Sequence, residues 1–203
     1  MAYSAIILAG GRGKRMGNRE KALMVINGKP LIDYVIKSLE NVVDEIIISV
    51  RDKSQGDVLK QIMPGYTYAN DEFENKGPLS GMLSGLTLCK NEFCFIGACD
   101  MPFINENVVK MLFRLSEAYE AAIPRWEDGF LEPLHAVYRC KSMIRESRKA
   151  IELGENTIIA PIFRINVNYI SIETIRKIDP DLRTFININT PEDMEQITNN
   201  IDQ

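Results

Sequence analysis

Histidine is scarce in this sequence, and its cysteines lack the spacing of metal ligands or redox pairs. Histidine occurs once, at His135, and no two cysteines form a Cys-x-x-Cys pair. Cys89, Cys94 and Cys99 are five apart, Cys140 stands alone, and Cys94 lies in an apolar run where a thiol packs as a small hydrophobic group. A structural metal site or a set of disulfides is therefore disfavoured, and we expect a reducing, cytoplasmic environment.

Long apolar runs are also missing. No stretch approaches the roughly 20 apolar residues that cross a bilayer, and the amino terminus has no basic region followed by an apolar core and a cleavage site. The net charge is −4, whereas a broad nucleic-acid surface needs a clustered positive field. We therefore expect neither a membrane nor a nucleic-acid partner. The 203 residues suffice for one large core, which predicts a single domain over 1–203.

The most informative stretch is residues 5–21. It opens with an apolar run, 5–9, of the length and composition of a buried strand. The loop that follows combines glycines, which let the backbone approach an anion closely, with cations. The glycines are Gly10, Gly11, Gly13 and Gly17, and the cations are Arg12, Lys14, Arg15 and Lys21. This composition indicates a polyphosphate-binding loop, with a flexible turn of solvated cations as the alternative.

Two well-known phosphate-binding motifs do not fit this loop. Walker A requires Ser or Thr after a Gly-Lys pair, but Gly28 and Lys29 are followed by Pro30. The dinucleotide motif Gly-x-Gly-x-x-Gly begins at Gly11 but meets Met16 where its last glycine belongs. The sequence therefore predicts a third kind of phosphate loop.

Strand and helix patterns alternate along the rest of the chain. This alternation predicts an α/β fold of three layers, in which a mostly parallel sheet is flanked by helices. Asn105 is the expected cap of one helix, and Thr190 is the expected cap of the last, with Pro191 at its first position. Expected strands are 45–50, 66–69, 93–99, 121–124, 134–138 and 166–170, and expected helices begin near 30, 57, 77, 106, 141 and 157.

Three residues outside the loop are candidates for chemistry. Asp100 follows a buried strand, where open α/β sheets bind ligands, and is our candidate metal ligand; a cap or turn former is the alternative. Gly81 costs a helix about 1 kcal/mol relative to alanine, so either a ligand or backbone approaches it closely or its helix packs against the sheet. His135 fits acid–base chemistry or ligand contact, and equally a packed, hydrogen-bonded histidine.

Three features are expected to meet at the strand ends. The basic loop, 10–21, can hold a triphosphate, the segment 71–81 can contact a base or ribose, and Asp100 can hold Mg²⁺ that bridges phosphate oxygens. Together they are the equipment of nucleotidyl transfer.

Five motifs occur in order between Ile7 and about Glu195. They read L-A-G-G-R-G-K-R-M-G-N-R-E-K, G-P-L-S-G-M, C-D-M-P, E-P-L-H-A-V-Y and N-I-N-T-P-E-D. As an ordered set they resemble the molybdenum cofactor guanylyltransferase (MobA-type) family. The resemblance implies a nucleotidyltransferase-type α/β fold and transfer of GMP from GTP to the terminal phosphate of molybdopterin, with release of pyrophosphate. It also implies Mg²⁺ as cofactor and other cofactor-biosynthesis proteins as further partners.

The resemblance also implies roles for individual residues. Arg15 and Lys21 would neutralise the phosphates of GTP, and Asp100 would bind Mg²⁺. The GTP-contacting set would be Leu8, Ala9, Gly10, Gly11, Lys21, Ser49, Asp71, Gly81 and Asp100, with Arg15, Lys21 and Asp100 as the catalytic residues. Asn187 and Asn189 match the Asn-x-Asn motif on the molybdopterin side, with strand-end asparagines in turn hydrogen bonds as the alternative.

Two positions depart from the family pattern. Gly13 replaces a small serine or alanine, and Glu20 replaces the aspartate usual before the lysine; neither removes a charge or a required donor. The pair Gly10-Gly11 resembles guanylyl-transferring members more than cytidylyl-transferring ones. The alternatives are a related enzyme that uses CTP or a sugar-phosphate acceptor, and a nucleotide-binding module without turnover.

Overall fold

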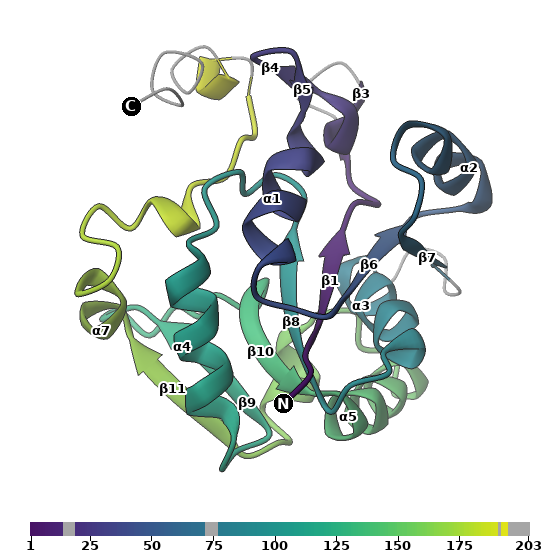
Figure 1. Ribbon diagram of the computed structural model, residues 1–203. Coiled ribbons are helices and arrows are strands. Elements are labelled where there is room, and N and C mark those ends of the chain that lie inside the picture. The colour runs from purple at the N-terminus through teal and green to yellow at the C-terminus, as the bar shows by residue number, and fades with distance from the viewer. Residues whose placement is uncertain (14–18, 72–76, 191, 195–203) are drawn as a thin grey trace.

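A seven-stranded sheet forms the centre of the computed structural model (Figure 1), which describes residues 1–13, 19–71, 77–190 and 192–194. Its strand order is β11-β9-β10-β8-β1-β6-β7. The strands are β1 (Ser4–Leu8), β6 (Glu45–Val50), β7 (Thr67–Asn70), β8 (Phe93–Ala98), β9 (Ala121–Arg125), β10 (His135–Arg139) and β11 (Val167–Ser171). β8, β1, β6 and β7 are mutually parallel neighbours, so their carboxyl ends meet at one edge.

Helices cover both faces of this sheet. Residues on successive positions of β1 alternate between two cores, because side chains of a strand point alternately to opposite faces: Ala5 and Ile7 pack on one side and Ile6 on the other. The first core is completed by α1 (Leu31–Glu40), α2 (Lys53–Ile62), α4 (Glu106–Ser116) and α7 (Ile172–Arg176). The second is completed by α3 (Gly77–Leu88), α5 (Cys140–Glu152) and α6 (Ile159–Ile162). The three-layer α/β fold is confirmed (Figure 1).

Smaller elements connect the phosphate loop to α1. β2 (Arg12–Gly13) pairs with β3 (Arg19–Glu20), and the 3₁₀ turn η2 (Lys21–Leu23) follows. β4 (Val25–Ile26) and β5 (Lys29–Pro30) then form a hairpin through Asn27 and Gly28, whose φ values are 46° and 78°. Positive φ at both central residues is typical of the two-residue turns that Asn-Gly favours. The Asn27-Gly28 dipeptide therefore forms the tight turn between these two strands.

Two features differ from the expected pattern. β10 runs antiparallel to both β8 and β9, so the sheet is mostly but not entirely parallel. α2 begins at Lys53, four residues before the expected start, because Asp52 caps it by accepting a hydrogen bond from Gln55 N at 2.8 Å. No helix among the described residues is long and apolar enough to cross a membrane.

Candidate active site

The carboxyl ends of β1, β6, β7 and β8 lie side by side. Backbone hydrogen bonds continue past the strand ends and fix the first residues of each following segment. These bonds join Ala9 N to Ser49 O (2.8 Å), Cys99 N to Leu8 O (3.1 Å) and Asp71 N to Val50 O (2.9 Å). The loop after β1, Asp71 and Asp100 are therefore held at the same edge of the sheet, as the sequence predicted.

Lys21 lies at the centre of this edge. Its ammonium is 2.8 Å from Asp100 Oδ2 and 2.7 Å from Asn189 Oδ1, and the Lys21 and Asp100 side chains are each only 16% exposed. Ile188 N donates to Asp100 O at 2.9 Å, so the segment before Asn189 is fixed beside the end of β8. Three predicted site residues far apart in the chain thus form one cluster. An ammonium has three protons, and these two contacts leave one for a further acceptor.

One oxygen of the Asp100 carboxylate is not used by the described residues. Its Oδ1 atom is buried and accepts no hydrogen bond in the described part of the chain. A buried carboxylate oxygen without a partner is costly unless a ligand completes it. Within the described ranges no group of three or more acidic, histidine or cysteine side chains could hold a metal by itself. This donor set fits Mg²⁺, which is often held by one or two carboxylates together with substrate phosphates and water.

The two predicted asparagines have different surroundings. Asn189 is anchored in a turn in which Asp193 Oδ2 accepts from the backbone N of Asn189 and of Thr190, at 2.8 and 2.9 Å. The Asn189 N–H is the main cause that lowers the pKa of Asp193. Thr190 Oγ1 accepts from Asp193 N, which confirms the predicted cap. Asn187, by contrast, is exposed and donates to Phe185 O at 3.2 Å, a local contact of the kind named as its alternative.

Asp71, Ser49 and Gly81 are brought together around the start of α3. Ser80, fully buried in α3, donates its hydroxyl to Asp71 Oδ1. A Cβ atom added at Gly81 would lie 2.8 Å from Ser49 Oγ and 3.5 Å from Leu8 Cδ2. Ser49 is itself only 2% exposed. Packing of α3 against the sheet therefore accounts for the glycine, and nucleotide contact by Ser49 or Gly81 stays a prediction.

The first residues of the phosphate loop are held against the segment after β6. Gly10 passes so close to this segment that an added Cβ would lie 3.1 Å from Arg51 N, whereas Gly11 is exposed with open space around it. Ala9 is fully buried. Arg15, predicted to contact the phosphates, lies outside the described residues, as does Pro191.

The sequence marks Glu20 only as a departure from the family pattern and does not predict that Glu20, Arg51 and Gln55 together hold this loop. Glu20 forms an ion pair with Arg51 (2.8 Å) and accepts from Gln55 (2.6 Å). A signal was present: Asp52 followed three residues later by Gln55 is the pattern of a helix start with a capping box. Because that helix was predicted to begin at Asp57, Gln55 was not placed in the first turn of α2, where its side chain is buried.

His135 is packed in the core, and Cys99, which immediately precedes Asp100, is buried. His135 is fully buried, with Nε2 3.0 Å from Thr184 Oγ1 and its ring edge-on to Phe95 and Phe185. Burial lowers the pKa of His135 to about 3, so the ring is neutral at physiological pH. Of the two roles considered for His135, the structure supports the packed, hydrogen-bonded histidine. All four cysteines are free.

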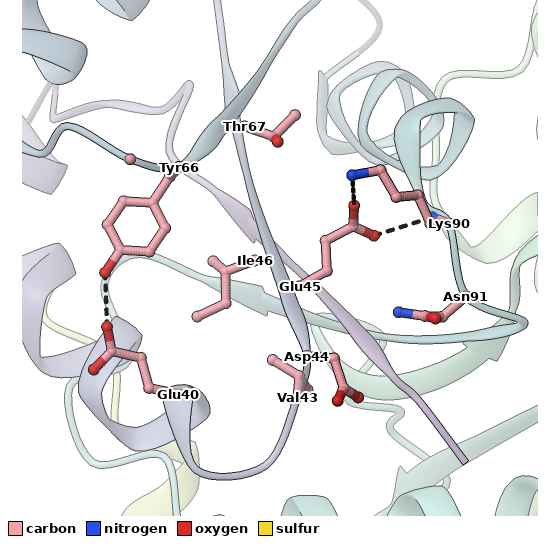
Figure 2. Close-up of a pocket in the computed structure, with 10 residues that line it drawn as sticks. Glu40, Val43, Asp44, Glu45, Ile46, Tyr66, Thr67, Lys90 and Asn91 are labelled. Carbon is pink, nitrogen blue, oxygen red and sulfur yellow. Dashed lines mark hydrogen bonds and ion pairs between the residues drawn. The ribbon is translucent and has the colours of Figure 1, made fainter.

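A hollow of about 560 Å³ lies at the amino-terminal ends of β6 and β7 (Figure 2). Glu45, at the amino end of β6, and Tyr66, just before β7, contribute to its lining. The Tyr66 hydroxyl donates to Glu40 at 2.7 Å, and Glu45 forms an ion pair with Lys90; Figure 2 marks both contacts with dashed lines. The hollow lies at the opposite ends of the strands from Lys21 and Asp100. It supplies positions for control substitutions.

A mostly parallel sheet with a glycine-rich basic loop, a lysine and a carboxylate at its carboxyl edge defines a nucleotide-binding α/β protein of the nucleotidyltransferase type. The family described as MobA-like NTP transferase domain matches residues 5–164. The chain belongs to this family, and it is a nucleotidyltransferase. The resemblance stated from the motifs is thereby confirmed.

Individual relatives agree with this assignment. The chain is 44% identical over 200 residues to a protein of Methanosarcina mazei named probable molybdenum cofactor guanylyltransferase, covering 96% of this chain and 89% of that protein. It is 33% identical over 198 residues to the molybdenum cofactor guanylyltransferase of Desulfosudis oleivorans, covering 96% and 94%. The crystal structure of molybdopterin-guanine dinucleotide biosynthesis protein A from Archaeoglobus fulgidus superposes with a TM-score of 0.85 at 29% identity, covering 98% of both chains.

Proposed function

We propose that the protein transfers GMP from GTP to the terminal phosphate of molybdopterin, forming molybdopterin guanine dinucleotide and pyrophosphate. The observation that carries the proposal is the cluster of Lys21, Asp100 and Asn189, in which one carboxylate oxygen is buried without a partner. The names of relatives that span nearly the whole chain support the same reaction. A cytoplasmic location is proposed with it, since free cysteines are typical of a reducing compartment.

The nucleotide is proposed to lie across the carboxyl ends of β1, β6 and β7. The backbone of residues 8–11 would line it, and Arg15 and Lys21 would neutralise its phosphates. Asp71, oriented by the Ser80 hydroxyl, would contact the base or ribose together with Ser49 and the backbone of Gly81. A carboxylate at this place can accept two N–H groups of a guanine edge or two ribose hydroxyls.

Magnesium ion, when bound to Asp100, would supply positive charge that neutralises the phosphate oxygens of the nucleotide. Lys21 would supply a second positive charge, from the protein itself. Its ammonium is fixed by Asp100 and Asn189, and its remaining proton is available to a phosphate oxygen. Charge that is already in place when the transition state forms costs no reorganisation at that moment.

The reaction needs no strong general base in this proposal. A phosphate oxygen of molybdopterin is already an anionic nucleophile, so it can attack the α-phosphorus of GTP in line with the leaving pyrophosphate. The neutral, buried His135 accords with this, because it is not available as a base. Asn187 and Asn189 would lie on the acceptor side, and Asn189 would join the acceptor to Lys21.

The substitution Asp100→Asn tests the assignment. It keeps the shape of the side chain but removes the charge, and we expect Mg²⁺-dependent turnover to fall about 1,000-fold, because a metal ligand contributes several kcal/mol in the transition state. Tyr66→Phe, in the hollow of Figure 2, is the control and should retain wild-type turnover. If Asp100→Asn folds correctly and turns over GTP with Mg²⁺ at a near-normal rate, the role of Asp100 is wrong.

A further inference from the structure

A single glutamine joins the two arms of the phosphate loop. Gln55 is 5% exposed, in the first turn of α2. Its Nε2 donates to Ala9 O at 2.8 Å on the outgoing arm and to Glu20 Oε2 at 2.6 Å on the returning arm. Its Oε1 accepts from Arg51 N at 2.8 Å, so both amide protons and the carbonyl are used.

Arg51 reinforces the same connection. Its Nη2 forms an ion pair with Glu20 Oε1 at 2.8 Å, and its Nη1 donates to Gly10 O at 3.3 Å. Both oxygens of the Glu20 carboxylate are therefore engaged, one by Gln55 and one by Arg51. The carbonyl groups of two consecutive loop residues are likewise held: Ala9 O by Gln55 in the first turn of α2, and Gly10 O by Arg51 just after β6.

This arrangement fixes the direction of two loop N–H groups. In a trans peptide unit the C=O and N–H groups point in opposite directions. Holding Ala9 O and Gly10 O toward α2 therefore turns the N–H groups of Gly10 and Gly11 away from it. Since Gln55 holds Ala9 O, the N–H of Gly10, which belongs to the same peptide unit, points to the opposite side from Gln55.

The same contacts fix the residue that precedes Lys21. With Glu20 held at both oxygens, the chain enters η2 from a defined position, and Lys21 reaches Asp100 at 2.8 Å. Convergent N–H groups and a fixed cation are what a polyphosphate requires. None of the protein contacts of Gln55 involves Lys21 or Asp100 directly.

We propose that Gln55 is a positioning residue for the triphosphate of the nucleotide: by holding Ala9 O and Glu20 it aims the N–H groups of the loop and Lys21 at the phosphates. The inference rests on the proposed function and deepens it. Gln55 does not touch the substrate, and its effect passes through the loop.

The substitution Gln55→Glu is the most direct test. It is nearly isosteric, but the introduced carboxylate cannot donate to Ala9 O and it lies against the carboxylate of Glu20. We expect the Kd of Mg·GTP, measured by calorimetry, to rise at least about tenfold, because a buried charge-assisted hydrogen bond is replaced by repulsion. KM for molybdopterin should stay within about twofold, since the acceptor lies at Asn189 on the other side of Lys21.

A change of pH separates positioning from stability. Protonation of the introduced carboxyl restores one hydrogen-bond donor, so the loss of Mg·GTP affinity in Gln55→Glu, measured relative to wild type at the same pH, should shrink as pH is lowered. The charged groups that face it are Glu20, Arg51 and Asp52. Gln61→Glu is the matched control. Gln61 is exposed on the same helix, so the charge change is equal, and the affinity of this variant for Mg·GTP should equal that of wild type at every pH.

Arg51→Gln is the second variant, for the case that Gln55→Glu does not fold. Arg51 is 26% exposed, and its loss releases Gly10 O and one Glu20 oxygen while the Gln55 contacts remain. It should also weaken Mg·GTP binding about tenfold. Unchanged Kd in folded Gln55→Glu or Arg51→Gln, equal loss in Gln61→Glu, or no binding of Mg·GTP by wild type overturns the proposal. Wild-type binding without pyrophosphate release would overturn the proposed function alone, because the comparison of Kd values still stands.

Discussion

Gly81 is the position where packing and ligand binding are most sharply opposed. In α3, its missing side chain leaves room for the Ser49 hydroxyl, which would lie 2.8 Å from an added Cβ. Alanine is favoured over glycine in a helix by about 1 kcal/mol, whereas overpacking a buried site costs about 1 to 3 kcal/mol. Because Ser49 lies in an inner strand of the sheet and is 2% exposed, it cannot move far. We expect Gly81→Ala to lower the free energy of unfolding by about 1 kcal/mol.

Removing the hydroxyl should reverse this loss. In Ser49→Ala the nearest remaining atom of that side chain is Cβ, 4.0 Å from the added methyl group, which is ordinary contact. The double variant Ser49→Ala/Gly81→Ala should therefore be as stable as Ser49→Ala or more so, by up to about 1 kcal/mol. Urea unfolding of the four proteins gives the coupling free energy, and calorimetry on the same samples gives the Kd of Mg·GTP. We expect that Kd to match the Ser49→Ala value.

Gly85→Ala is the control on the same helix. Its added Cβ would meet three Ile6 atoms at 2.8 to 3.0 Å, so it should destabilise the protein similarly, and Ser49→Ala should not restore it. Two outcomes would refute the reasoning. Either Ser49→Ala leaves the Gly81→Ala defect in place, or the double variant is stable but has lost GTP affinity. The second would mean that the nucleotide itself needs the space at Gly81.

Two further predictions concern His135 and Lys21. The unfolded chain protonates His135 near pH 6.5 but the folded protein only near pH 3, so stability is lost as pH falls through this window; between pH 7 and 5 the loss is about 2 kcal/mol. Urea midpoints should show a smaller drop in His135→Gln, and an equal drop would contradict the buried, neutral state. Lys21→Met should lower kcat/KM for GTP about 100-fold without abolishing folding, measured by pyrophosphate release. A change in KM for molybdopterin alone would remove Lys21 from the phosphate site.

Local patterns predicted much of the fold. The run 45–50 coincides with β6, and Asn105 accepts from the N–H groups of Asn107 and Val108 as the expected cap. Buried strands read as continuous apolar runs, however, and such a run carries no signal of direction. The antiparallel course of β10 had a different signal, because the segment 126–134 that joins β9 to β10 holds no helix and is too short for a parallel crossover; the prediction of a mostly parallel sheet did not use it.

The sequence predicted the main residues of the site but not the residues that hold the phosphate loop in place. Asp100 and Lys21 follow recognisable strand and loop signals, and the structure joins them at 2.8 Å. The contacts of Glu20 with Arg51 and Gln55 join side chains 31 and 35 residues apart, and no short-range period or motif encodes them. They depend on where α2 begins, and element boundaries are the least reliable part of a sequence prediction.

Product formation from labelled GTP tests the central claim most directly. Purified protein, molybdopterin and Mg²⁺ are incubated with GTP carrying its label on the α-phosphorus, and with CTP, UTP and ATP labelled in the same way. We predict that the label of GTP appears in a dinucleotide with molybdopterin, in step with pyrophosphate release, and that the other nucleotides react much more slowly. Preferred transfer from CTP, or GTP binding without label transfer, would contradict the proposed guanylyltransferase.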